Sequence, residues 1–336
     1  MQTLFSLRRG ARSGGARVFL AAGAGGVLCA LLLFLPAALQ LSGRSRAPVR
    51  VWAADRDAHR VVGLDGDLIV VRELQLAWPV ALAPRVDGGL WVLRSGNATA
   101  SFGMRLSSLA ASGVEESETW IEAGEQLAVV DGRDALVVEY GTGANSVDRV
   151  LRVQPDGAAR VVLEDAHLHG LCASRGTVVV GTTDGRLARY EASGSKRLLA
   201  KATWTASFGA LAEGGPPGAF FALDTSAQHR LEFVGDDLAR RWSVPIGFDA
   251  RHLGVVAGEE RVWVADVNGS RVRRYGPGGV LERDHVLPAH ALDHPVAFAD
   301  GVLVATPGAI LRVDSAGQPR PGQGGFAWLS DLVPAR

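Results

Sequence analysis

The stretches VWAAD (51–55), FFALD (220–224) and RVWVAD (261–266) decide the fold, because each is a short apolar run that ends in an aspartate. Similar runs recur about every 42 residues from Val51 almost to the C-terminus. They begin near Val51, Leu90, Ala135, Thr177, Ala219, Arg261 and Gly301. A repeat of this length that is built only of strands is typical of a β-propeller, with one four-stranded blade per repeat.

The strand pattern within each repeat predicts an all-β, seven-bladed β-propeller over residues 50–336. These runs are the second strands of their blades, and they consist mostly of Val, Leu, Trp, Phe and Ala, as expected of strands covered on both faces. The first repeat lacks an innermost strand, and AWLSDLVPA (327–335) supplies one at the other end of the chain. We therefore predict that the C-terminal strand completes the N-terminal blade and closes the ring without free edges.

The N-terminal region is predicted to be an uncleaved membrane anchor. A basic tail (1–17) precedes 24 uncharged residues (18–41), and a linker (42–49) leads to the propeller. The apolar segment is long enough to span a bilayer core of ~30 Å, whereas a cleaved signal peptide has a shorter apolar core and small residues before the cut. Cleavage remains the alternative. The arginines before the segment favour a cytoplasmic N-terminus and an exported propeller, in the periplasm or outside the cell.

Composition narrows the class of partner. Lysine plus arginine equal aspartate plus glutamate over the whole chain, but residues 1–50 hold seven arginines and no acid, so the remainder has a net charge of −7. An acidic body argues against nucleic-acid binding, which needs a basic surface. Cys29 and Cys172 have no metal-type spacing, and Cys172 is expected to be a small buried side chain.

Three segments resemble NHL-type propeller repeats, a family related to the YVTN and streptogramin-lyase-like propellers. They are VWAADRDAHRVVGLDGD (51–67), FFALDTSAQHRLEFVGDD (220–237) and RVWVADVNGSRVRRYGPGG (261–279). Each pairs an aspartate at a strand end with an arginine that opens the next strand. These pairs are Asp55 with Arg60, Asp224 with Arg230, and Asp266 with Arg271. We expect the pairs to stabilise turns rather than to bind a ligand.

The residues that start the innermost strands are predicted to ring one mouth of a central channel. Aligned across the repeats, this position holds Trp78, Glu125, His169, Phe208, His252 (beside Leu253), His294 and Trp328. Aromatic residues concentrate at recognition surfaces, so the mouth is predicted to bind a protein, peptide or glycan without catalysis. The propeller is expected to be monomeric.

The alternative is a metal-dependent lyase or hydrolase. Imidazoles and a carboxylate on one channel are suitable ligands for a divalent ion such as zinc, and calcium is the other candidate ion. The NHL resemblance also implies this, because peptidyl-amidoglycolate lyases, streptogramin lyases and lactonase-type propellers place their functional residues in this region. The metal candidates would be Glu125, His169, His252 and His294. No residue is assigned a catalytic role, and a purely structural envelope protein is the third possibility.

Overall fold

A computed structural model describes residues 47–96, 102–141, 147–174, 176–193, 197–267, 269–291 and 294–335. The predicted basic tail (1–17), the anchor (18–41) and most of the linker (42–49) lie outside these residues. Among the residues described, no helix is long and apolar enough to cross a membrane. The regular secondary structure there is almost entirely β, with one short 3₁₀ helix, η1 (Pro277–Gly279).

The described strands form six antiparallel sheets, and the first of them joins the two ends of the described chain. Its order is β27 (Leu329–Pro334), β1 (Val51–Asp55), β2 (Arg60–Leu64), β3 (Val70–Gln75). Ala53 lies opposite Leu332 and Val51 opposite Pro334 in the antiparallel register of β1 and β27. The prediction that the C-terminal strand completes the N-terminal sheet is confirmed.

The second sheet is longer because one strand belongs to two neighbouring arrays. Its order is β4 (Pro79–Pro84), β5 (Leu90–Arg94), β6 (Phe102–Leu109), β7 (Glu115–Val130), β8 (Asp134–Glu139), β9 (Asp148–Val153), β10 (Ala159–Asp165). The first part of β7 pairs with β6, and the part from Gly124 onward pairs with β8. An outermost strand thus runs directly into the next innermost strand, where the sequence suggested two separate strands.

The other four sheets each contain four strands in chain order. The third is β11 (Leu168–Ser174), β12 (Thr177–Thr182), β13 (Arg186–Glu191), β14 (Leu198–Thr203). The fourth is β15 (Phe208–Glu213), β16 (Phe220–Asp224), β17 (Arg230–Val234), β18 (Arg240–Pro245). The fifth is β19 (Leu253–Val255), β20 (Val262–Ala265), β21 (Arg271–Tyr275), β22 (Leu281–Val286). The sixth is β23 (Val296–Phe298), β24 (Gly301–Thr306), β25 (Ala309–Val313), β26 (Pro319–Gly324).

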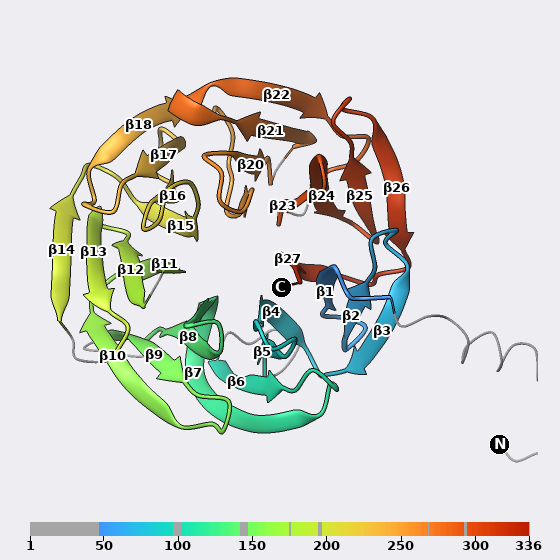
Figure 1. Cartoon of the computed structure of the whole chain (residues 1–336), viewed down its shortest axis with the longest axis horizontal. Helices are drawn as coiled ribbons and strands as arrows, with labels where there is room; N and C mark the ends of the chain where they lie inside the picture. Colours follow the sequence, from blue (N-terminus) through green and yellow to red (C-terminus); the bar gives the residue numbers. More distant parts are fainter. Residues whose placement is uncertain are drawn as a thin grey trace, which may run out of the picture. The chain divides into compact units, whose positions relative to one another are not determined.

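The sheets stand around a central axis, with their first strands inside and their last strands outside (Figure 1). Each innermost strand contacts the innermost strands on both sides, so β27, β4, β7, β11, β15, β19 and β23 follow one another around the centre. Burial matches this position. All five residues of β1 and β16 are buried, whereas the outer strands β3 and β14 alternate between half-buried and exposed residues. An apolar sequence pattern therefore indicates a strand near the axis, and an alternating pattern indicates a strand far from it.

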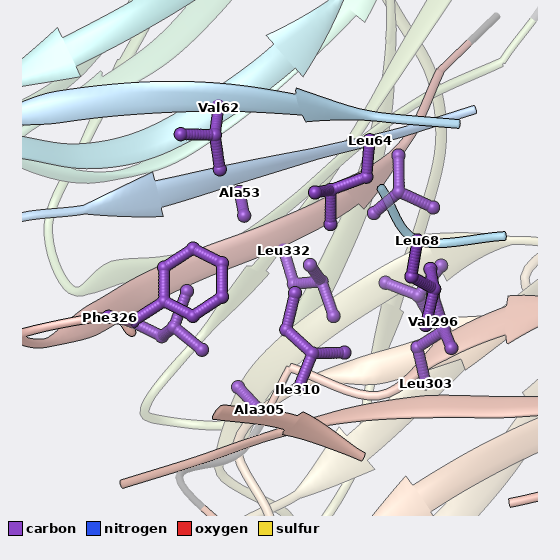
Figure 2. Packing of buried hydrophobic residues seen from close by; sticks show 12 residues of the cluster. Ala53, Val62, Leu64, Leu68, Val296, Leu303, Ala305, Ile310, Phe326 and Leu332 are labelled. Carbon is purple, nitrogen blue, oxygen red and sulfur yellow. The ribbon is translucent and has the colours of Figure 1, made fainter. Parts of the chain in front are cut away.

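The hydrophobic core lies between neighbouring sheets. Figure 2 shows Phe326 and Leu332 between Val62 of the first sheet and Ile310 of the sixth. The turns before the outermost strands also contribute to this core. Leu68 and Leu238 occupy left-handed conformations, with φ of 61° and 62°, where most of the equivalent turns have glycine. Burial of both side chains offsets the backbone strain that a left-handed leucine carries.

Candidate functional site

The innermost strands surround a channel of about 1690 Å³. Its lining comes from β4, β7, β11, β15, β19, β23 and β27 and from the loops that adjoin them. Among the aspartate, glutamate, lysine and arginine residues on the lining, acidic ones outnumber basic ones: Glu125, Glu213, Asp249, Glu260 and Asp331 against Arg251. At neutral pH such a channel attracts cations.

A bulge near the start of several innermost strands turns one extra residue toward this channel. The register of β11 shifts between Leu168 and Gly170, and the skipped residue is His169. The same shift skips Val80 in β4, Gly209 in β15 and Ser330 in β27. All four skipped residues line the channel. A bulge that redirects a side chain is a common device next to functional sites.

Four of the predicted mouth residues do line the channel: Glu125, His169, His252 and His294. His169 Nδ1 lies 3.2 Å from the carbonyl oxygen of Phe208 on the neighbouring strand. Glu125 is exposed and belongs to β7, next to His169 on β11. These two residues therefore occupy one side of the channel.

The two other histidines meet on the opposite arc of the channel. The imidazole rings of His252 and His294 are 3.9 Å apart between centroids, with an angle of 32° between their planes. His294 Nδ1 is 3.1 Å from Asp331 Oδ1. Asp331 is buried, and its Oδ2 accepts a hydrogen bond of 2.7 Å from the amide of Leu82. Three adjacent innermost strands, β19, β23 and β27, thus bring two imidazoles and a carboxylate together, and β4 holds the carboxylate from behind.

Asp331 did not figure among the residues predicted from the sequence. One signal could have identified it: it is a carboxylate within an apolar strand that the sequence had already placed beside the channel. An acidic group in that environment needs a partner. The buried position of Asp331 between His294 and Leu82 satisfies this need.

Phe208 does not reach the channel, and its prediction as a mouth residue is corrected. Its side chain is fully buried and packs with Cys172, Val179 and Phe220. Phe208 pairs with Asp224 before the bulge, and Gly209 is the residue that lines the channel. The error is a shift of one residue, which in a strand moves a side chain to the other face.

Trp78 and Trp328 lie just before innermost strands rather than on the channel wall. Trp78 is half-buried, and its ring makes an edge contact with the imidazole of His59 at 4.0 Å between centroids. Trp328 is 43% exposed, and the guanidinium of Arg56 lies 5.5 Å from its ring centre. The two tryptophans flank adjacent innermost strands, β4 and β27, at the ends where these strands begin. We call this pair of residues the tryptophan rim.

The aspartate at the end of β1 anchors the tryptophan rim. Asp55 is completely buried, and its Oδ1 accepts hydrogen bonds from the amides of Ala327 (3.0 Å) and Trp328 (2.9 Å). Its Oδ2 accepts a bond of 3.1 Å from Arg60 Nε, as the sequence predicted. Arg230 and Arg271 follow other patterns: Arg230 donates to Ser243 Oγ, and Arg271 Nε lies 3.6 Å from an Asp284 oxygen.

Among the residues that the structure describes, no group of three or more histidine, cysteine, aspartate or glutamate side chains is arranged to hold a metal ion. Glu125 and His169 do not join His252 and His294 in such a group. Cys172 is buried, as expected, and burial raises the pKa of its thiol to about 12.

Comparisons with known proteins identify the fold. No family model matches the chain, and no curated protein matches it. Similar solved structures include dihydro-heme d1 dehydrogenase NirN in complex with DHE, at 14% identity and a TM-score of 0.59. That match covers 81% of this chain, which spans 62% of NirN. A candidate 6-phosphogluconolactonase from Bacteroides fragilis is 11% identical with a TM-score of 0.63, over 86% of this chain and 98% of that one.

The Swd1 β-propeller domain from Myceliophteria thermophila is 12% identical with a TM-score of 0.58, over 78% of this chain and 94% of that domain. Together with the ring of four-stranded arrays, these similarities show that the chain is an all-β protein of the β-propeller class. At these identities the similarity concerns the fold alone.

Proposed function

We propose that the protein is a membrane-anchored, exported β-propeller that binds a protein, peptide or glycan at the mouth of its channel, without catalysis. In this proposal residues 18–41 cross the membrane and the N-terminus is cytoplasmic. The binding surface comprises the tryptophan rim together with Glu125, His169, His252 and His294. The repeats are of the NHL type.

The sharing of β7 supports a count of seven blades. β4, β5, β6 and the first part of β7 make one four-stranded array, and the rest of β7 with β8, β9 and β10 makes the next. With the other five sheets, this interpretation gives seven blades, in agreement with the seven sequence repeats. An additional strand break between residues 120 and 125 would separate the arrays without changing the count.

The observation that carries the proposed function is the tryptophan rim beside the channel. Exposure of a tryptophan ring to water is unfavourable compared with its burial, and tryptophans are enriched at the centres of binding interfaces. Asp55 accepts a hydrogen bond from the backbone amide of Trp328, and the guanidinium of Arg56 lies over its ring. The fold therefore holds Trp328 in its exposed position. A preorganised aromatic side chain loses little entropy when a ligand covers it.

Peptide and glycan arrays probed with the purified full-length chain test this proposal. We expect at least one class of ligand to bind, and binding to fall at least tenfold in the Trp78→Ala/Trp328→Ala variant. Trp120→Ala is the matched control, because Trp120 is 63% exposed but lies on the part of β7 that pairs only with β6. Equal loss of binding in both variants would refute a specific role of the rim.

The contact between His294 and Asp331 favours a second candidate, a lyase or hydrolase. A carboxylate that accepts a hydrogen bond from one imidazole nitrogen fixes the tautomer, and the other nitrogen can then accept a proton. Hydrolysis of ester and lactone substrates by the full-length chain, compared with its His294→Gln variant, tests this candidate. Turnover equal in both proteins would exclude His294 as the base.

A further inference from the structure

The acidic residues on the channel lining are only partly neutralised by their neighbours. Arg251 Nη2 lies 4.0 Å from Asp249 Oδ2, and Asp331 contacts the imidazole of His294. Three glutamates of the lining have no such partner, because in the part of the chain that the structure describes no lysine or arginine forms an ion pair with them. They are Glu125, Glu213 and Glu260. The lining therefore has an excess of negative charge at neutral pH.

A comparison with a carboxylate outside the channel shows what these glutamates lack. Asp165 pairs with the guanidinium of Arg186 at 2.7 Å, which neutralises its charge. Glu213 instead accepts a hydrogen bond of 2.6 Å from the neutral hydroxyl of Ser174, so its charge remains. Glu125 is exposed to solvent in the channel, and a cation that enters can reach its carboxylate.

Glu125 lies beside the tryptophan rim. The innermost strands β27, β4 and β7 are neighbours around the axis. Trp328 directly precedes β27, and Trp78 directly precedes β4. Glu125 occupies the corresponding position in β7, where this strand begins to pair with β8. Three consecutive strands therefore present two aromatic rings and one carboxylate at the same end of the channel.

We propose that the ligand of the channel mouth is a basic polypeptide segment, and that one of its lysine or arginine side chains enters the channel beside Glu125. This inference rests on the proposed binding function and narrows its ligand classes to one. The channel and the tryptophan rim define the site, and the charges select the ligand.

The rim favours the same class of ligand independently of the carboxylates. The face of a tryptophan ring attracts a lysine or arginine side chain, because the ring carries negative electrostatic potential there. The guanidinium of Arg56 already lies 5.5 Å from the ring centre of Trp328. A basic segment can therefore contact the rim and the lining with groups of the same charge.

The apolar part of the lining suits the stem of such a side chain. Leu127, Leu171 and Val296 also line the channel. Lysine and arginine pack their methylene stems against apolar surface while the charged head group reaches polar groups. A neutral glycan has no charge to pair with Glu125, and an acidic glycan is repelled by it.

The test measures binding of labelled decapeptides to the purified full-length chain by fluorescence anisotropy. Three probes alternate glycine with lysine, with glutamine or with glutamate. We expect the lysine probe to bind at least tenfold more tightly than the glutamine probe, and the glutamate probe not to bind. An increase of NaCl from about 0.05 M to about 0.5 M should weaken binding of the lysine probe at least fivefold, because salt screens the charges.

Substitutions at Glu125 locate the cation. Glu125→Gln should weaken binding of the lysine probe at least fivefold, whereas Glu125→Asp, which keeps the charge, should change it less than twofold. Glu164→Gln is the matched control, because it removes the same charge from the outer strand β10, where Glu164 is 44% exposed. It should change binding less than twofold. Melting of each variant checks its folding.

Spermidine separates a polypeptide from a small polyamine. It carries ammonium groups without a peptide chain, so it should compete at least tenfold more weakly than unlabelled lysine probe. Equal competition would assign the site to a free polyamine and would overturn the proposal. Equal weakening by Glu125→Gln and Glu164→Gln, or equally tight binding of the glutamine probe, would also overturn it.

Failure of this inference and failure of the proposed function give different results. If the arrays yield an acidic peptide or a glycan whose binding needs Trp78 and Trp328, the proposed function stands and this inference is wrong. If the Trp78→Ala/Trp328→Ala variant binds the lysine probe as well as the parent does, while Glu125→Gln weakens binding, the proposed role of the rim is wrong and the cation contact at Glu125 remains.

Discussion

Replacement of Asp55 by alanine should loosen the closure between the two ends of the propeller. The carboxylate is completely buried and accepts hydrogen bonds from the amides of Ala327 and Trp328 and from Arg60. Hydrogen bonds to a charged group contribute about 1.5–3 kcal/mol each. The pair with Arg60, which is 25% exposed, adds about 0–1 kcal/mol because water screens it.

Two amides that lose a charged acceptor would by themselves cost about 3–6 kcal/mol. Ala327 and Trp328 are exposed, so water can hydrate their freed amides, and we expect the lower end of this range, about 3 kcal/mol. In a propeller-sized domain, about 3 kcal/mol lowers the melting temperature by roughly 5 °C. Circular dichroism of the full-length variant measures this change.

The matched control is Asp237→Ala. Asp237 is an exposed turn residue whose Oδ1 accepts hydrogen bonds from the amide of Ala239 at 2.9 Å and from Arg241 Nη2 at 3.0 Å. Because water screens both contacts, its loss should lower the melting temperature much less than the loss of Asp55. Hydrogen exchange adds a local readout: the amides of β27 should exchange faster in Asp55→Ala but not in Asp237→Ala. Similar melting temperatures for the two variants, or unchanged exchange in β27, would refute the closure role of Asp55.

Three other predictions concern buried groups. Burial raises the pKa of the Cys172 thiol to about 12, so in a Cys29→Ser background it should resist alkylation at pH 8 until the chain unfolds; rapid labelling of folded protein would contradict its burial. Leu238→Ala should cost about 2–4 kcal/mol in urea unfolding, against about 0.5 kcal/mol or less for the exposed Leu198→Ala, and equal costs would show that Leu238 is not packed. Burial also raises the pKa of the Glu232 carboxyl above its ordinary value of 4.5. The folded chain therefore holds the carboxyl proton more tightly than the unfolded chain does. Stability is lost as the pH rises from 4.5 through the pKa of the folded chain. Glu232→Gln should remove that loss. The melting temperature of the variant minus that of the parent should therefore increase from pH 4 to pH 8, and a decrease would show that the pKa of Glu232 is not raised in the folded chain.

The sequence predicted the sheets well because burial imposes a pattern on each strand. Strands near the axis are covered on both faces and read as apolar runs, and outer strands alternate. The closing strand was predictable because the first repeat lacked an innermost strand and the C-terminus supplied one. The continuity of β7 was not predictable, because a chain that continues as one strand or bends between two arrays has the same apolar pattern.

The channel residues were predicted less well, for a reason that lies in strand geometry. A bulge adds one residue to a strand, and no local pattern distinguishes the residue before it from the bulged residue. The alignment therefore mixed His169, which is the bulged residue, with Phe208, which precedes the bulge and is buried. The contact between His252 and His294 and the role of Asp331 depend on how neighbouring sheets pack, which the repeat alone does not specify.

The proposed binding function requires that ligands enter at the mouth where the innermost strands begin. Hydrogen exchange of the full-length chain, with and without a ligand selected on the arrays, tests it most directly. We predict slower exchange with ligand in residues 78–82, 252–255, 294–298 and 328–332. Protection confined to the outer strands β3, β14 and β22 would contradict this requirement, because it would place the binding surface on the outer circumference of the propeller.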